Sequence, residues 1–402
     1  MTRLGNLLQN AYGGLSRETW ILSFTQFINR SGSMVIFFLS VYLQEELGMT
    51  LQDAGIVMSF YGAGSFIGVF FGGRAVDRFG HRPVMLLSLL GGGIMFLVVS
   101  LISDFYLLLL GMFVLSAMAE MFRPAGQVAM SYYAHATNYT RSVSLYRLAI
   151  NLGFALGPAL GGIIALYNYR MIFWVDGATC LLASGLIYYF LKPKDMEVDA
   201  EAEDIEEKPA SLWRDRPYVA FVPLVTLYGI AFFQFFTTMA LYYKNEMQFD
   251  EPQIGLLLAL NGLLVAIVEV VLIYKIESKG SLYRWIFWGG ILLALSYGLL
   301  FFAHSYAWFI LIIIVISFSE MFAMPFMNTF MNQRSDPRAK GKYASWYVMA
   351  WSAAQIITPL LATQIAIHWG YPVLWITLAA LSIFVSLGIL RIKRMAERER
   401  PE

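Results

Sequence analysis

The sequence predicts an all-α membrane protein whose twelve transmembrane helices form two six-helix bundles. The chain is 58% hydrophobic and only 14% charged, whereas soluble domains contain about one quarter charged residues. Long apolar segments recur along the whole sequence, and a helix needs about 20 apolar residues to cross a bilayer. The two halves of the chain also resemble each other, which indicates a pseudo-two-fold relation between the bundles.

A single long hydrophilic segment separates the sixth span from the seventh. Thirteen of its residues, 195–207, include eight acids, a composition typical of a solvated linker. We therefore expect an N-terminal bundle (1–191), an acidic cytoplasmic linker (192–217) and a C-terminal bundle (218–402). The predicted spans are 18–43, 53–73, 83–103, 105–130, 143–167, 170–191, 218–243, 252–276, 283–303, 306–331, 343–367 and 371–391.

The distribution of positive charge predicts the orientation. With the N-terminus inside, the cytoplasmic segments contain 23 of the 28 lysines and arginines, and the outer loops contain only Arg170 and Lys244. Cytoplasmic loops of membrane proteins carry this excess, so both termini are expected in the cytoplasm. The N-terminal segment is too polar for a cleaved signal sequence. We expect an integral protein of a bacterial inner membrane.

The resemblance between the halves follows a constant offset of about 200 residues. Parallel repeats of six spans describe two bundles related by an axis along the membrane normal, with substrate sites near the midplane. The matched positions include Gly55 and Gly255, Gly62 and Gly262, Gly80 and Gly280, and the tripeptides that begin at Glu120 and Glu320.

The loop between spans two and three contains "GRAVDRFGHR", residues 73–82. Its glycines allow a tight turn, and its aspartate can cap a helix and pair with a cation. The segment resembles the G-x-x-x-D-R-x-G-x-R signature of the major facilitator superfamily, which implies a latch that joins the two halves when the protein faces outward. The alternative is a turn with ordinary cytoplasmic arginines. The matching residues are Gly73, Asp77, Arg78, Gly80 and Arg82.

Span five contains "NLGFALGPALGG", residues 151–162. Small residues let helices approach closely in lipid, and proline permits a bend. Generic packing of small residues is therefore an alternative explanation of this segment. The segment is similar to the G-x-x-x-G-P-x-x-G-G motif of the drug/proton antiporter branch of the same superfamily. The matching residues are Gly153, Gly157, Pro158, Gly161 and Gly162.

Charged residues inside spans each need a reason, because one at a helix centre costs about 2.5–3.5 kcal/mol on insertion scales. Glu120 and Arg123 are three residues apart and can meet on one helix face. Glu320 has Ala323 at the position of the arginine, and Glu269 has apolar sequence neighbours. Burial without a cation favours the protonated acid. We therefore rank the proton-coupling candidates as Glu320, then Glu269, then Glu120 with Arg123; the alternatives are a static ion pair and structural hydrogen bonds.

The remaining intramembrane polar groups are expected to line a substrate cavity. Span seven adds aromatic area and one amide that suit a large amphipathic ligand, although these side chains could equally face lipid. Asp176 lies near the outer end of span six, where it is expected to reach headgroup water. The cavity candidates are Asn29, Arg30, Arg147, Asn151, Tyr228, Phe232, Gln234, Phe236, Asn261, Asn328 and Gln355.

The resemblance implies a proton-coupled secondary transporter that works by alternating access, exporting amphipathic drug-like compounds or metabolites by antiport. The alternative is a symporter that imports a peptide, sugar or organic anion. A nucleotide-binding loop and the usual hydrolase motifs are absent from the sequence, so an enzyme is not expected; a receptor on the same fold is a further alternative. The expected partners are a small-molecule substrate, protons and lipid, without nucleic acid, metal or cofactor, and we expect a monomer.

Overall fold

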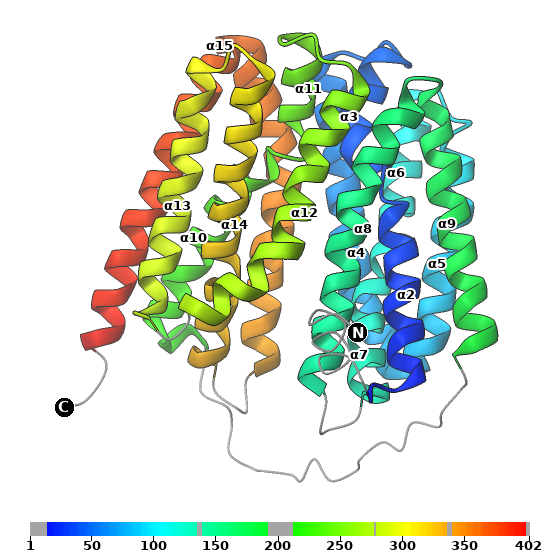
Figure 1. Ribbon diagram of the computed structural model, residues 1–402, viewed down its shortest axis with the longest axis horizontal. Helices are drawn as coiled ribbons and strands as arrows, with labels where there is room; N and C mark the ends of the chain where they lie inside the picture. Colours follow the sequence, from blue (N-terminus) through cyan, green and yellow to red (C-terminus); the bar gives the residue numbers. More distant parts are fainter. Residues whose placement is uncertain (1–13, 135–138, 192–211, 277–278, 336–339, 399–402) are drawn as a thin grey trace, which may run out of the picture. The chain divides into compact units, whose positions relative to one another are not determined.

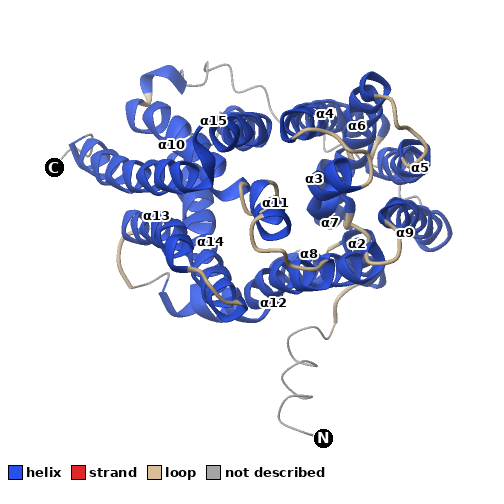
Figure 2. Cartoon of the chain, turned by 90° about the horizontal axis from the view of Figure 1, so that it is seen from above, coloured by secondary structure: helices blue, strands red, loops and turns tan. Residues whose placement is uncertain are grey.

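The computed structural model describes residues 14–134, 139–191, 212–276, 279–335 and 340–398 (Figure 1). Their regular secondary structure is entirely helical (Figure 2). Most of the predicted linker, residues 192–211, lies outside the described residues. The described residues fall into two compact units. The first takes its residues from Met1–Gly48, Phe60–Met196 and Gln248–Ala266, and the second from Met49–Ser59, Glu197–Met247 and Ile267–Glu402.

The helices before the linker form most of the first unit. In this unit α2 lies against α8 and α9, and α5 lies against α6, α7 and α9. The helices are α2 (Arg17–Ser31), α3 (Val35–Glu45), α4 (Leu51–Phe79), α5 (His81–Val99), α6 (Phe105–Glu120), α7 (Phe122–Tyr133), α8 (Tyr139–Ala165) and α9 (Tyr169–Phe190).

The helices after the linker form most of the second unit. Here α10 and α13 both pack on α15, and α13 also packs on α14. The elements are η2 (Leu212–Arg214), α10 (Arg216–Phe233), α11 (Thr238–Asn245), α12 (Glu251–Ile276), α13 (Leu282–Leu299), η3 (Leu300–Phe302), α14 (Tyr306–Arg334) and α15 (Lys340–Arg398).

The lengths of the helices match the thickness of a bilayer. Ten helical segments among the described residues are long and apolar enough to cross a membrane. The longest, α15, contains two helices joined at Gly370, whose φ of 80° is not helical. Helices α2 and α3 have 15 and 11 residues, so neither reaches spanning length alone.

Polar caps at the ends of the spans explain where several helices begin. The carboxylate of Asp104 accepts a hydrogen bond of 2.9 Å from the backbone N–H of Leu107 at the start of α6. Asn168 accepts one of 2.7 Å from the N–H of Arg170 at the start of α9. These side chains satisfy N–H groups that have no partner within the helix.

Three spans are interrupted, each in a different way. Residues 32–34 separate α2 from α3, and residues 234–237 separate α10 from α11. Helix α6 stops at Glu120 and α7 starts at Phe122. Pro124 explains this third interruption, because it has no N–H to donate to the carbonyl of Glu120, four residues earlier.

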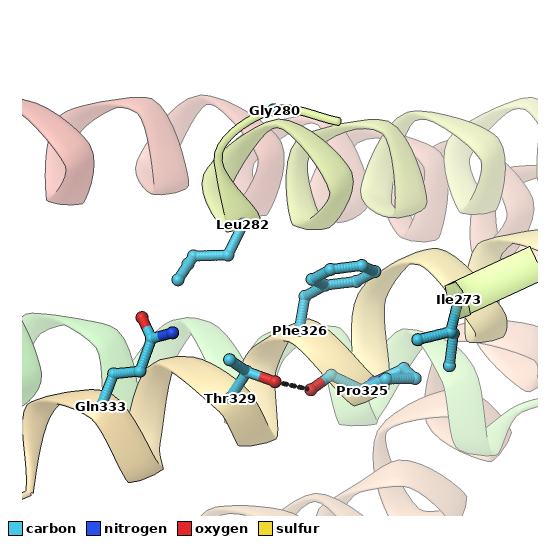
Figure 3. A pocket seen from close by; sticks show the side chains of 7 residues that line it. All are labelled: Ile273, Gly280, Leu282, Pro325, Phe326, Thr329 and Gln333. Atoms are coloured by element: carbon cyan, nitrogen blue, oxygen red, sulfur yellow. Dashed lines mark hydrogen bonds between the residues drawn. The ribbon is translucent and has the colours of Figure 1, made fainter. Parts of the chain in front are cut away.

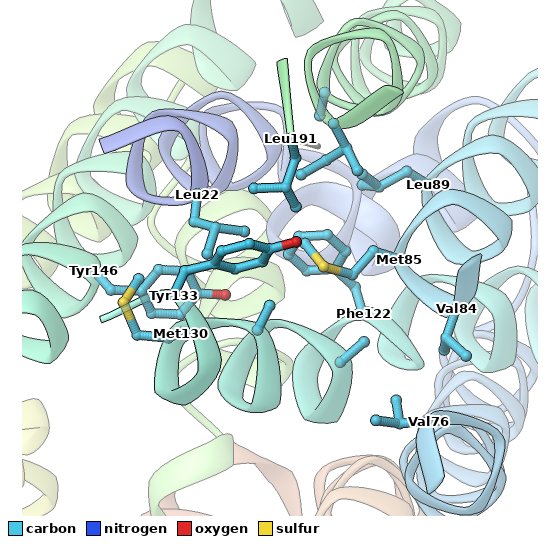
Figure 4. Packing of buried hydrophobic residues seen from close by; sticks show 14 residues of the cluster. Leu22, Val76, Val84, Met85, Leu89, Phe122, Met130, Tyr133, Tyr146 and Leu191 are labelled. Atoms are coloured by element: carbon cyan, nitrogen blue, oxygen red, sulfur yellow. The ribbon is translucent and has the colours of Figure 1, made fainter. Parts of the chain in front are cut away.

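The packed core of the first unit lies where α2, α4, α5, α7 and α8 converge (Figure 4). Leu22, Met85 and Phe122 are at most 2% exposed and come from three different helices. Tyr133 and Tyr146 add aromatic area to the same cluster. This core fixes α7 against its neighbours and therefore holds the segment that carries Arg123.

Candidate functional site

The charged pair predicted in span four is present and asymmetric. Arg123 Nη2 lies 3.0 Å from Glu120 Oε2, and the side chain of Arg123 is 55% exposed whereas that of Glu120 is 10% exposed. The interruption at Met121 separates the two residues, with Glu120 closing α6 and Arg123 opening α7. The pair therefore joins a buried carboxylate to a cation that remains open to the surroundings.

Two tyrosines that sequence reasoning missed lie around this pair. Tyr61 interacts electrostatically with Glu120, Arg30 and Arg123. Tyr146 interacts with both arginines, and its hydroxyl fills the space beside Gly126. Asp176 also interacts with Tyr61, so the first unit collects two guanidinium groups, two carboxylates and two phenols. A tyrosine within an apolar span was the available signal, because its hydroxyl needs a polar partner there.

Arg30 is held on α8 by the predicted glycine motif. Its guanidinium carbon lies 5.2 Å from the centre of the Phe154 ring. A Cβ built on Gly153 would lie 2.5 Å from the Cβ of Arg30, and one built on Gly157 would lie 3.2 Å from its carbonyl oxygen. Gly161 continues the same face, 3.1 Å from the Cβ of Met34. These glycines therefore let α8 touch the interruption between α2 and α3.

The opposite face of α8 meets the start of α12 within the first unit. A Cβ on Gly162 would overlap the carbonyl oxygen of Glu251, and one on Gly262 would lie 2.7 Å from the backbone nitrogen of Ala155. Glu251 accepts a hydrogen bond of 2.5 Å from the hydroxyl of Tyr169. Gly162 and Pro158, both motif residues, thus belong to this second contact, since Gly255 packs on the carbonyl of Pro158.

Asp176 corrects one expectation from the sequence. Its side chain does not reach headgroup water: the residue is 1% exposed. Its carboxylate accepts backbone hydrogen bonds from Met34, at 3.1 and 3.0 Å, and from Val35, at 2.9 Å. The physical reason is the interruption of span one, which leaves the first N–H groups of α3 without helical partners.

In the second unit, Glu320 lies beside a buried tyrosine. Glu320 is half-buried and interacts electrostatically with Tyr228. The Tyr228 hydroxyl is 3.0 Å from the Ser319 hydroxyl, which in turn donates to the carbonyl of Gly289 at 2.7 Å. This chain joins α10, α13 and α14 around the carboxylate. Helix α14 runs without interruption through Glu320 although it contains Pro325, unlike the first copy of this segment.

Aromatic rings from α10 and α15 surround Tyr228. The ring of Trp351 lies 6.1 Å from that of Tyr228 and 5.8 Å from that of Phe233. Phe232 lies 5.6 Å from Phe236. Sequence reasoning proposed the residues of span seven but missed Trp351 and its neighbour Tyr347, which lie 6.3 Å apart. We call Tyr228, Phe232, Phe233, Phe236, Tyr347 and Trp351 the aromatic cluster.

The other predicted cavity residues occupy varied environments. Glu269 and Asn261 on α12 are 6% and 7% exposed, and Gln234 is fully buried in the interruption between α10 and α11. Asn29 donates to the Cys180 sulfur at 3.4 Å, and Asn328 accepts from Asn332 at 2.6 Å. Arg147 is exposed, whereas Asn151 and Gln355 are half-buried.

The predicted loop of residues 73–82 is mostly helical: residues 73–79 end α4, residues 81–82 begin α5, and Gly80 alone lies between the two helices. Gly80 has a φ of 84°, a value that favours glycine. Arg82 donates to the carbonyls of Leu191 at 2.9 Å and Tyr188 at 3.0 Å, so it caps the end of α9. Gly73 is half-buried, and Asp77 and Arg78 are exposed.

A separate cavity of about 380 Å³ lies in the second unit near the ends of α12 and α14 (Figure 3). Its lining is both polar and apolar, and the polar side chains are the amide of Gln333 and the hydroxyl of Thr329. Thr329 donates to the carbonyl of Pro325 at 2.9 Å, so its hydrogen is already used. The lining residues are Ile273, Gly280, Leu282, Pro325, Phe326, Thr329 and Gln333, and they include none of the predicted site residues.

Similarity to solved structures shows the fold. A POT family transporter in complex with 5-aminolevulinic acid superposes with a TM-score of 0.81 at 18% identity, covering 96% of this chain and 97% of that one. A variant of the nucleoside transporter NupG gives a TM-score of 0.81 at 12% identity, covering 93% and 98%.

Sequence relatives extend over most of the chain. A Na(+), Li(+), K(+)/H(+) antiporter from Planococcus maritimus is 24% identical over 91% of this chain and 94% of its own length. The quinolone resistance protein NorA from Staphylococcus aureus is 22% identical over 79% and 82%. The profile of the Major Facilitator Superfamily matches residues 20–356 and 283–402. Together with the helical fold and the membrane-spanning lengths of its helices, this match shows that the chain belongs to the Major Facilitator Superfamily of membrane transporters.

Proposed function

We propose that the protein is a proton-coupled secondary transporter that exports amphipathic drug-like compounds or metabolites by alternating access. The observation that carries this proposal is the position of Glu320 beside Tyr228 and the aromatic cluster in one unit. A carboxylate next to an apolar aromatic surface can exchange a proton for an amphipathic substrate. One proton crossing 100 mV contributes about 2.3 kcal/mol, which supports accumulation without ATP.

The environments of the three glutamates support the order Glu320, Glu269, Glu120 for proton exchange. Glu120 has a cation at 3.0 Å, and a neighbouring cation stabilises the ionised form. Glu269 is 6% exposed, so water reaches it with difficulty. Glu320 is half-buried and lies next to a phenol, which combines burial with access.

We propose further that the chain crosses the membrane twelve times in two six-helix bundles, with both termini in the cytoplasm of a bacterial cell. The separation of α15 at Gly370 supports two crossings there. Helices α2 and α3 together cover Arg17–Glu45, enough for one more. The distribution of lysine and arginine then supports a cytoplasmic position for the linker and an outer position for the loop before Met49.

A second candidate is a symporter that imports an organic anion or a peptide. The first unit offers a cation for it, because the side chain of Arg123 is 55% exposed. Guanidinium groups bind carboxylates and phosphates well. Export of an amphipathic compound and import of an anion make opposite predictions for proton movement.

Substrate-induced proton flux in proteoliposomes with an internal pH dye tests both candidates. The added probes are a quinolone, a dipeptide and a monovalent cation (Na⁺ or K⁺), each compared with no addition. Antiport predicts that a quinolone gradient drives protons the opposite way; symport predicts that a dipeptide carries protons with it. Glu320→Gln is expected to lower coupled flux at least tenfold, and Glu269→Gln and Glu120→Gln less.

Asp53→Asn serves as the control, because the half-buried carboxylate of Asp53 accepts hydrogen bonds from the hydroxyl and N–H of Thr50 at a helix start. Wild-type coupling in all three glutamate variants would contradict the assignment of the proton to these carboxylates. Proton flux that no probe changes would contradict both transport candidates.

A further inference from the structure

The interruption of span one is held by one buried carboxylate. Asp176 on α9 accepts from the N–H groups of Met34 and Val35, with distances between 2.9 and 3.1 Å. The two donors stand at the start of α3, a helix of 11 residues, where a negative charge is stabilised by the helix dipole. Because the residue is 1% exposed, water does not replace the carboxylate as the acceptor.

The last turn of α2 is fixed against the same face of α9. A Cβ on Gly32 would overlap the Thr179 hydroxyl oxygen, so the backbone at the end of α2 packs directly on the Thr179 side chain. Asn29 donates to the Cys180 sulfur at 3.4 Å. Arg30 lies between these contacts and faces Phe154 on α8. The position of its guanidinium therefore depends on how the interruption is held.

The equivalent interruption in the second half is held differently. The N–H groups of Phe235 and Phe236 bond to the carbonyls of Phe232 and Phe233, at 3.1 and 3.0 Å, within the same segment. The residue 200 positions after Asp176 is Ile376, which is 56% exposed. A carboxylate from another helix thus accepts at the first interruption, whereas backbone carbonyls of the same segment accept at the second.

We propose that Asp176 is a positioning residue whose ionised carboxylate keeps the interruption closed and Arg30 in place, and that protonation of this carboxylate releases both. A neutral acid has lost the charge that the N-terminus of α3 stabilises and keeps only its unprotonated oxygen as a strong acceptor, so its hydrogen bonds to the two N–H groups weaken. The titratable groups that interact electrostatically with it are Tyr61 and the Cys180 thiol, and each of these also interacts with Arg30. The link to transport rests on the proposed function, but the release itself does not.

Cys180 provides the measurement, because it is the only cysteine of the chain and it is buried under Asn29. The rate of its alkylation by N-ethylmaleimide is measured from pH 5 to pH 8 in the full-length protein in detergent, without substrate. Wild type is compared with Asp176→Asn, and the ratio of the two rates cancels the ordinary pH dependence of the thiol. Protonation of Asp176 also changes the thiolate fraction of Cys180, so convergence of the two alkylation rates counts as release only if the amide hydrogen exchange of Met34 and Val35 in wild type approaches that of Asp176→Asn over the same pH range. Convergence of the alkylation rates without this change in exchange overturns the proposal.

At high pH we expect Asp176→Asn to react at least tenfold faster than wild type, because the amide cannot hold the interruption. As the pH falls and Asp176 is protonated, the wild-type rate should approach that of the variant. A ratio that stays at one overturns the proposal. A ratio above one that does not change with pH also overturns it, since it would indicate a carboxylate that is structural only.

Asp104→Asn is the matched control, because Asp104 also accepts a backbone N–H at a helix start but lies at an exposed end; its rate should equal that of wild type at every pH. If Asp176→Asn does not fold, the native wild-type rate is divided by the rate of the same protein unfolded in dodecyl sulfate. A native-to-unfolded ratio that rises as the pH falls supports the proposal, and one that is independent of pH contradicts it. Neither measurement involves transport, so a failed release is distinguished from a failed transport assignment.

Discussion

Glu120 and Arg123 are partners of unequal exposure, and this difference sets what the loss of either residue does. Removing the arginine leaves a carboxylate in a site that is only 10% exposed, whereas removing the glutamate leaves a cation that is 55% exposed. Loss of one partner of a fully buried pair costs about 3–5 kcal/mol. The exposure of Arg123 reduces this figure, because water already solvates part of its charge.

We therefore expect Arg123→Ala to lower the free energy of unfolding by roughly 1 kcal/mol. Glu120→Gln should lower it less, and the double variant should recover most of the loss, because neither charge then lacks its partner. The thermal unfolding of the detergent-solubilised variants, followed by intrinsic fluorescence, measures these differences. Equal losses in the two single variants that add in the double variant would show that the pair does not interact.

Some residues of the site could be predicted from the sequence, and others could not. The charged pair could be predicted, since three-residue spacing on a helix brings two side chains together. Tyr61, Tyr146 and Trp351 were missed because an aromatic residue in an apolar span gives no sign of which neighbour it meets. The partner of Asp176 was missed because it is backbone, and backbone N–H groups become available only where a helix is interrupted.

At the scale of the element, α8 is the helix on which most of the first unit depends. Gly153, Gly157 and Gly161 face α2 and α3, and Gly162 faces α12. Close approach of this kind depends on small residues, because helices in lipid gain stability from packing rather than from a hydrophobic driving force. A single added methyl group on this face should separate the helices.

Gly153→Ala is expected to reduce both thermal stability and transport, because the new Cβ would lie 2.5 Å from the Cβ of Arg30 and 3.0 Å from its backbone carbonyl carbon. Gly185→Ala on α9 is the matched control, since nothing lies within 4 Å of the Cβ it would add. Alanine replaces glycine favourably in a helix by about 0.5–1 kcal/mol. The control should thus be at least as stable as wild type in the same thermal unfolding assay. A stable, active Gly153→Ala protein would show that α8 can shift without consequence.

Helix positions were predicted more completely than helix interruptions. Apolar length locates the spans, because the bilayer imposes it. The interruption at Met121 has a readable cause in Pro124, but those at residues 32–34 and 234–237 contain no proline. The first of these depends on Asp176, a partner elsewhere in the fold, and so on a tertiary contact that local sequence does not contain.

For the whole molecule, an even number of crossings has a direct consequence for the two termini. A chain of twelve spans whose N-terminus is cytoplasmic must also end in the cytoplasm. A chain that crossed with the ten candidate segments and one further segment would cross eleven times and end outside. A green fluorescent protein fused after Glu402 should fluoresce, because it matures in the cytoplasm, and alkaline phosphatase fused there should be inactive.

Fusions after Thr50, between α3 and α4, provide the internal comparison and should show the reverse pattern. Thr50 belongs to the first loop after span one and is exposed. An active phosphatase at both sites would contradict the twelve-span topology, as would fluorescence at both.

Two helices belong to both compact units, and this limits how the units can move. The boundary falls between Ser59 and Phe60 in α4 and between Ala266 and Ile267 in α12. Ser59 is bonded on one side to the carbonyl of Gly55 at 3.0 Å and on the other to that of Ile356 at 2.9 Å. A displacement of one unit must therefore bend these two helices, or separate residues 51–59 of α4 and 267–276 of α12 from the rest of the helix. The elastic stiffness of α4 and α12 would then set part of the energy barrier, independently of any bound substrate.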